Sequence, residues 1–154
     1  MLATSVVTAC DREPVDATPE GAVNEFLHRM ASVHGEAEYS EAAFELLAPA
    51  AQANLEERAA RATAVAGRYV APHEMLVPSR FNLAFRPVEF SAEITGQWAI
   101  VTVTGETEQE TASIRCEIVD GGWKIVIDLP PLPPIKYRDV EVPRAVKDSH
   151  DWTD

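Results

Sequence analysis

The stretch GGWKIVIDLPPLPP, residues 121–134, marks where the folded part of the chain ends. Its first half is rich in β-branched and aromatic residues, which is typical of a strand. The prolines that follow cannot donate the hydrogen bonds of a central strand, so the chain must leave the sheet as an extended, semi-rigid rod. We therefore expect the last strand of the protein to run from Trp123 to Leu129.

Other strand-like runs precede this stretch and are separated by turn residues. Gly96-Gln97 and Asp120-Gly121-Gly122 suit tight hairpins, because glycine adopts the positive φ angles that such turns require. Strands joined by hairpins form an antiparallel meander, which can cover helices with one face and meet water with the other. The other predicted strands are 81–85, 88–95, 98–104 and 112–119.

Helical spacing of apolar residues dominates the chain before residue 67. Thr18 supplies a capping hydroxyl and Pro19 occupies the first helical position, so a helix is expected to begin there. Pro49 cannot lie inside a helix and must separate two helices. The predicted helices are Thr18 to Gly35, Ser40 to Ala48, and Ala48 to Gly67, with a short turn at Pro72 to Leu76. Helices first and strands after them indicate an α+β fold.

Composition limits the classes of partner. A chain of 154 residues fits one domain. Its 13 basic and 25 acidic residues give a net charge of -12, which repels phosphate backbones, so nucleic acid is not expected as a partner. The longest apolar runs are far shorter than the roughly 20 residues that span a bilayer, so we predict no transmembrane helix.

Cys10 carries the strongest indication of location. Val7-Thr8-Ala9-Cys10 resembles a bacterial lipobox, and it ends an apolar stretch just before the polar segment DREPVDATPE. Acyl chains on Cys10 would hold the protein at the cell envelope, on the periplasmic side of the inner membrane or at the outer membrane. Residues 2–9 are too short for a complete signal peptide, so we expect more sequence upstream. If Met1 is the true start, the alternative is an unmodified cytoplasmic protein.

These features divide the chain into four parts. Residues 1–10 are predicted to be a truncated signal and lipobox segment, and residues 11–17 a tether. Residues 18–132 form a single α+β domain. Residues 133–154 are the proline-rich exit and a polar tail that we expect to be disordered, because it is aperiodic and mixed in charge.

Cys116 is predicted to fill the core. It shares its strand face with Ile114 and Ile118, whereas Arg115 and Glu117 point to the opposite face. A nucleophilic cysteine needs a basic or cationic neighbour on its own face, and the sequence places none there.

Three segments of the chain resemble a known superfamily. They are TPEGAVNEFLHRM (18–30), AAFELLAPAAQANL (42–55) and WKIVIDLP (123–130). They are similar to the cone-shaped α+β domains of nuclear transport factor two and ketosteroid isomerase, and more closely to small lipoproteins of myxobacterial type within that superfamily. Over Thr18 to about Leu132, the resemblance implies a curved sheet wrapped round a long helix. The conical cavity would serve as an active site, as a docking surface, or be filled.

No catalytic motif accompanies this pattern. The sequence has no phosphate-binding glycine loop, nucleophile elbow or zinc-ligand spacing, and its four histidines are scattered, so neither a metal site nor a cofactor is expected. Isomerases of the superfamily imply a buried carboxylate base, but no residue here can be matched to it. The residues we consider for the lip of a pocket are Tyr39, Tyr69, His73 and Glu74.

The sequence therefore favours a lipid-anchored, non-catalytic binding or accessory domain. Its partner would be a protein or a small apolar ligand, and the oligomeric state stays open. The alternative is a small-molecule isomerase or dehydratase that uses an apolar cone with one acid. A cavity of about 300 Å³ or more with an acid at its base would favour catalysis, whereas a cone filled by phenylalanine, methionine and tryptophan side chains would not.

Overall fold

The computed structural model describes residues 13–33, 36–78, 81 and 83–135. Within these ranges the chain is α+β, as predicted, with three α-helices, one short 3-10 helix and a four-stranded antiparallel sheet. The elements are α1 (Pro19–Ser32), α2 (Ala37–Glu45), α3 (Pro49–Ala66), η1 (Pro72–Met75), β1 (Glu89–Thr95), β2 (Trp98–Thr104), β3 (Thr111–Val119) and β4 (Gly122–Val126). No helix in the described ranges has both the length and the apolar character needed to cross a bilayer.

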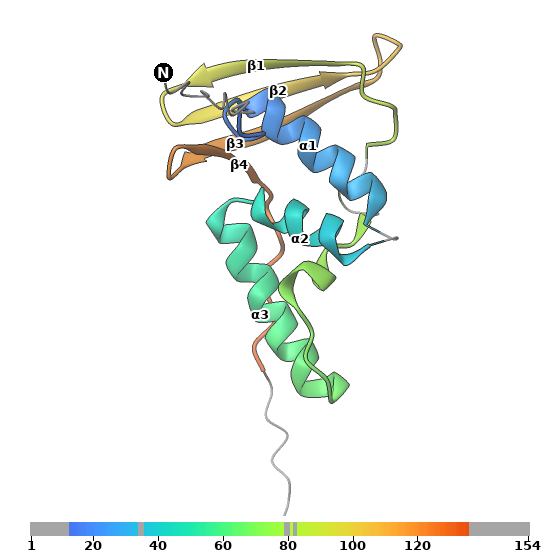
Figure 1. The fold of residues 1–154 in the computed structure, drawn as a ribbon, viewed down its shortest axis with the longest axis vertical. Helices are drawn as coiled ribbons and strands as arrows, with labels where there is room; N and C mark the ends of the chain where they lie inside the picture. Colours follow the sequence, from blue (N-terminus) through green and yellow to red (C-terminus); the bar gives the residue numbers. More distant parts are fainter. Residues whose placement is uncertain (1–12, 34–35, 79–80, 82, 136–154) are drawn as a thin grey trace, which may run out of the picture.

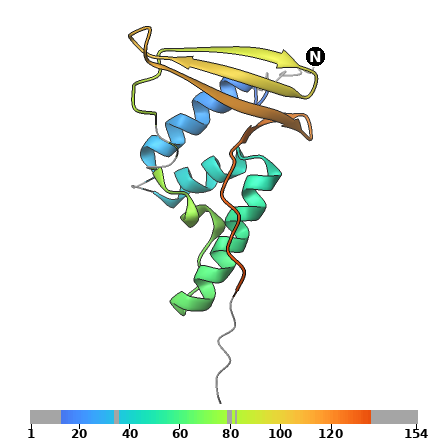
Figure 2. The ribbon, with the colours of Figure 1, turned by 180° about the vertical axis from the view of Figure 1, so that it is seen from behind.

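The elements stack along one long axis. The sheet forms one end of the molecule, and α1 crosses its inner face (Figure 1). α2 lies beneath α1, and α3 extends away from the sheet with η1 beside it (Figures 1 and 2). After β4 the chain turns away from the sheet and runs along α3 (Figure 2).

The strands follow one another in the order β1-β2-β3-β4. Thr95 pairs with Trp98 across a two-residue turn, in which Gly96 has a φ of 62°. Val119 pairs with Gly122 across a second turn, in which Asp120 and Gly121 have φ angles of 52° and 85°. Positive φ at Gly96 in the first turn, and at both positions of the second, matches the twist of tight hairpins, so both predicted hairpins are confirmed.

The core lies between α1 and the inner face of the sheet. One stripe of α1 carries Val23, Phe26 and Met30, all buried, at helical spacing. Alternate residues of the strands point toward this stripe and bury Val101, Val103, Cys116, Trp123 and Ile125. These side chains fill the space between α1 and the sheet.

The two tryptophans of the sheet, Trp98 and Trp123, lie on opposite faces of it. A strand tryptophan anchors the core if it faces inward, and Trp123, which is 7% exposed, does so. Trp98 is 48% exposed and lies on the opposite face, where the guanidinium of Arg115 sits 5.8 Å from its ring centroid. The alternation of a strand defines two faces but does not say which one meets the helices.

The free edge of β4 is covered by two segments that lie far away in the sequence. Asp16 accepts a hydrogen bond from the Trp123 amide at 2.8 Å, and its carboxylate pairs with Lys124 Nζ at 2.8 Å. Further along, Leu47 forms an isolated parallel bridge with Ile125. These contacts join the residues before α1, and the connection between α2 and α3, to the same edge of the sheet.

The proline-rich stretch is fastened to α3 by polar side chains. Arg58 Nη2 donates to the carbonyl of Pro130 at 2.7 Å, and Asn54 Nδ2 donates to the same oxygen at 3.3 Å. Arg61 Nη1 reaches the carbonyl of Pro133 at 2.5 Å. Because prolines have no N–H, the stretch cannot continue the sheet ladder, and its carbonyls accept from side chains of α3 instead.

One predicted strand and the predicted start of one helix were wrong. Residues 81 and 83–85 do not belong to a strand: Phe81 and Leu83 pack against the core from outside the sheet. The apolar side chains at every second position of this segment pack against the core, and no strand pairs with the segment. The second helix begins at Ala37, one turn before the predicted cap, and Ser40 lies inside it, donating its hydroxyl to the carbonyl of Ala37 at 2.8 Å.

Candidate functional site: a groove along α1

A hollow in the described part of the chain runs beside the buried stripe of α1. The α1 groove, as we call it, has a volume of about 640 Å³. One wall comes from α1 and the other from the segment that precedes β1. Its lining residues are Asn24, Leu27, His28, Ala31, Leu83, Phe85, Arg86 and Pro87.

Local sequence builds both walls. On α1 the groove residues recur at helical spacing, next to the stripe that holds Phe26 and Met30. The opposite wall is held by Phe81, whose ring meets the ring of Phe26 edge to face at a centroid distance of 6.2 Å. Beyond it, Pro87 precedes the point where the Val88 amide donates to the carbonyl of Thr104 at 2.8 Å and the sheet begins.

Apolar and polar groups occupy different parts of this groove. Leu27, Leu83 and Phe85 are partly buried and pack against the core, so they give an apolar floor. Asn24, His28 and Arg86 are exposed and supply polar groups. None of the lining residues is a carboxylate or a thiol.

A second hollow adjoins the first. The β3 notch, as we call it, has a volume of about 410 Å³ and shares Leu27 and Leu83 with the α1 groove. It exists because β4 ends at Val126, opposite Arg115, so the first residues of β3 have no β4 partner. On its rim, Arg115 Nη1 lies 3.6 Å from Asp128 Oδ2, so both charges are partnered.

The four residues considered for a pocket lip do not form one site. His73 and Glu74 line a hollow of about 380 Å³ between α2 and η1. Tyr39 lies elsewhere, with the guanidinium of Arg29 at 5.3 Å from its ring centroid. Tyr69 is 74% exposed at the far end of the helical part. None of the four lines the α1 groove, and Cys10 lies outside the described residues.

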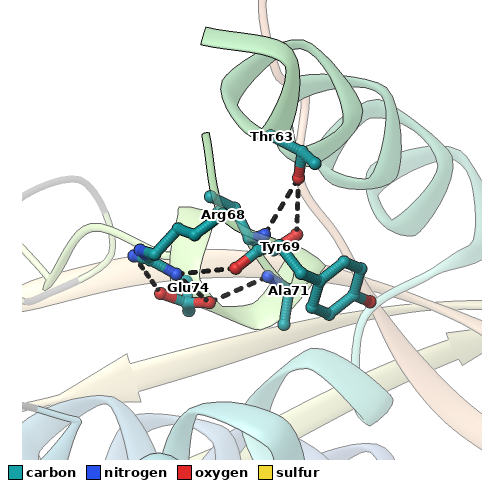
Figure 3. Close-up of polar contacts among 6 residues, drawn as sticks. Thr63, Arg68, Tyr69, Ala71 and Glu74 are labelled. Atoms are coloured by element: carbon teal, nitrogen blue, oxygen red, sulfur yellow. Dashed lines mark hydrogen bonds and ion pairs between the residues drawn. The ribbon is translucent and has the colours of Figure 1, made fainter. Parts of the chain in front are cut away.

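Figure 3 shows that Glu74 is held in a structural contact. Its carboxylate accepts a hydrogen bond from Arg68 Nη2 at 2.9 Å and another from the Ala71 amide at 2.8 Å. Beside it, Thr63 Oγ1 accepts from the Val70 amide at 2.9 Å. The hydrogen bond from Arg68, followed by that from Ala71, lowers the pKa of Glu74 to about 2. A carboxylate held ionised in this way fastens the loop after α3 and is poorly suited to donate a proton.

Glu74 should make the stability of the protein depend on pH. Its pKa is about 2 in the folded state, below its ordinary value of 4.5, so its contribution is complete above pH 4.5 and is lost as the pH falls through about 2. We expect Glu74→Gln to lower the midpoint of urea unfolding at pH 7. The difference from the parent protein should shrink below pH 4.5 and vanish only below pH 2. An equal difference at every pH would contradict this assignment.

Cys116 fills the core, as predicted. It is fully buried, and this burial, together with a smaller contribution from the charge of Glu20, raises the pKa of its thiol to about 12. A thiol in this environment is a poor nucleophile because the thiolate is the reactive form.

Cys116 should therefore be inert to thiol reagents in the folded protein. In a Cys10→Ser variant, Ellman's reagent at pH 8 is expected to label less than a tenth of the protein during the time in which a cysteine peptide reacts completely. In urea the same thiol should react at once. Rapid stoichiometric labelling without denaturant would contradict the burial of this side chain.

Comparisons with other proteins leave the function to be argued from geometry. No family model, curated protein or solved structure matches this chain. Among the described residues, no three His, Cys, Asp or Glu side chains gather into a group that could hold a metal ion. The α1 groove is therefore our candidate for the functional site.

Sequence reasoning missed this groove. His28 was considered only as a metal ligand, and the segment that carries Phe85 and Arg86 was assigned to a strand and its connection. One signal was available. Pro78 and Pro87 bracket the segment, and prolines at both ends argue against a paired strand.

Proposed function

We propose that this protein is a non-catalytic binding domain that takes a small apolar ligand in the α1 groove. The observation that carries the proposal is the composition of that groove: a hollow of about 640 Å³ with an apolar floor and three polar side chains on its walls. Small-molecule sites typically have volumes of about 300–1,000 Å³ and combine apolar linings with a few polar groups.

The absence of a carboxylate from the lining favours binding over proton transfer. The alternative function, an isomerase or dehydratase, requires an acid or base beside the substrate. The lining of the α1 groove contains no carboxylate: its one group able to take up or give a proton is the exposed imidazole of His28. The space deeper between α1 and the sheet is filled by buried side chains such as Phe26 and Met30.

In this proposal the domain belongs to the cone-shaped superfamily of nuclear transport factor two. The packing of α1 against one face of an antiparallel sheet supports that relationship. The filled space beneath α1 would make it a member whose cone is packed, with its ligand site moved to the margin. The lipobox-like residues 7–10 support acyl chains on Cys10, and an attachment at the cell envelope follows from them.

Mass analysis of the native protein tests the attachment. We expect a diacylated or triacylated Cys10 at the N-terminus and recovery in the membrane fraction. A Cys10→Ser variant should lose both properties. Recovery of an unacylated protein that retains Met1 and stays in the aqueous fraction would overturn the envelope proposal and leave the groove proposal standing.

Filling the groove tests ligand binding. Ala31 is exposed and lines the groove, so Ala31→Trp adds an indole there without entering the core. We expect saturable binding of the neutral dye N-phenyl-1-naphthylamine to the parent protein, measured by its fluorescence. In Ala31→Trp the Kd for the dye should rise by at least about tenfold, because the indole covers apolar surface that the dye would otherwise bury, and a tenfold change corresponds to about 1.4 kcal/mol.

The matched control is Ala60→Trp, which adds the same side chain to an exposed position of α3. Its dye affinity should equal that of the parent protein. Circular dichroism melting curves of both variants confirm that they are folded. Failure of the parent protein to bind the dye, or an equal affinity in Ala31→Trp, would overturn the proposal.

A further inference from the structure

The charge of the α1 groove narrows its ligand class. Although the chain as a whole has a net charge of -12, the groove lining contains a guanidinium, from Arg86, and no carboxylate. Among the described residues, the ion pairs involve Arg29, Arg61, Arg68, Arg115 and Lys124, so Arg86 has no ion-pair partner there. A positive group without a partner beside an apolar floor is complementary to an anion that carries an apolar chain.

Two acidic side chains close to the groove make contacts with other groups. Glu25, on α1, pairs with Arg29, with Oε1 and Nε 2.5 Å apart. Glu110, which lies beside Gly105 and close to the ring of Phe85, accepts a hydrogen bond from the Thr107 amide at 3.1 Å. Neither carboxylate forms an ion pair with Arg86, so the guanidinium is available to a ligand.

The residues that line the two hollows also indicate how a ligand would be oriented. Arg86 and Phe85 line the α1 groove alone, Leu83 lines both hollows, and Phe81 lines the β3 notch alone. Side chains along this segment therefore lead from a charged end to an apolar end. At the far side of the notch the charge of Arg115 is already partnered by Asp128, which leaves Arg86 as the group that selects an anion.

From this arrangement we infer that the α1 groove binds an amphiphile with a single anionic group, of the fatty-acid type. Its carboxylate lies at Arg86, with Asn24 and His28 as further hydrogen-bonding groups on the α1 side. Its alkyl chain covers Leu27 and Leu83 and points toward the β3 notch. This inference rests on the proposed function, because it assigns a ligand class to the same groove.

Competition between two ligands of equal chain length tests the charge. Decanoate, below its micellar concentration, and 1-decanol are each used to displace N-phenyl-1-naphthylamine from the parent protein. We expect decanoate to compete about five- to tenfold more strongly, because a charged hydrogen bond in a partly exposed site contributes on the order of 1 kcal/mol. In Arg86→Gln this advantage should disappear, while the affinity for 1-decanol stays the same.

Arg115→Gln is the matched control, because it removes a guanidinium from the rim of the adjoining hollow. It should leave the preference for decanoate unchanged. Equal competition by the two ligands in the parent protein, or a preference that Arg115→Gln removes and Arg86→Gln leaves intact, would overturn the inference while dye binding still upholds the proposed function. If the dye does not bind the parent protein at all, both proposals fail.

Discussion

Phe26→Ala is expected to lower the free energy of unfolding by about 3–5 kcal/mol, the range for truncating a buried phenylalanine. Phe26 is only 3% exposed and lies in the stripe of α1 that faces the sheet. Its ring also meets that of Phe81 at a centroid distance of 6.2 Å, so the substitution removes an aromatic contact between α1 and the wall of the α1 groove. Domains of this size have total stabilities of about 5–15 kcal/mol, so the loss would be a large part of the whole.

Urea unfolding followed by circular dichroism measures this effect. Phe85→Ala makes the same chemical change at a residue that is only partly buried and lines the groove. Its cost should be clearly smaller, because less surface is returned to water and the site is already open. Equal losses in the two variants would contradict the packing of Phe26 in the core.

Leu47→Ala is expected to cost about 2–5 kcal/mol, because it leaves a cavity at a fully enclosed position. Leu47 is 1% exposed and lies in the short connection between α2 and α3. On either side of it, the Ile125 amide donates to the carbonyl of Leu46 at 2.8 Å, and the Ala48 amide donates to the carbonyl of Ile125 at 2.8 Å. The connection thus joins the helical part of the molecule to the edge strand β4, and the Leu47 side chain lies in the same buried cluster as Ile125.

Hydrogen exchange distinguishes this role from a general loss of packing. In Leu47→Ala the amides of Ala48 and Ile125 should lose more protection than those in the middle of β2, because the junction opens before the sheet does. Val65→Ala, at a position that is 89% exposed, is the control and should change the stability by less than about 0.5 kcal/mol. A uniform loss of protection across the sheet would contradict a local role for Leu47.

Glu74, a candidate residue for a pocket, has a structural role that its neighbours in the fold determine. Glu74 was a candidate for the lip of a pocket because it lies at the end of an element and off the core faces, yet Arg68 and the Ala71 amide fix its carboxylate in place. The residues that line the α1 groove come from α1 and from a segment more than fifty positions later in the chain. Their proximity depends on how that segment packs, which residue spacing alone cannot reveal.

Local chemistry alone determined the beginnings of α1 and α3, because a capping hydroxyl at Thr18 and a proline at the first helical position act within one turn. The hairpin turns were also determined locally, since glycine tolerates positive φ angles. Tertiary structure decided that Trp98 faces outward and that Phe81, Leu83 and Phe85 pack against the core instead of joining the sheet. Apolar side chains at every second position can pack equally well beside a strand or against a helix. Only the tertiary structure decides between the two, and this packing also forms the α1 groove.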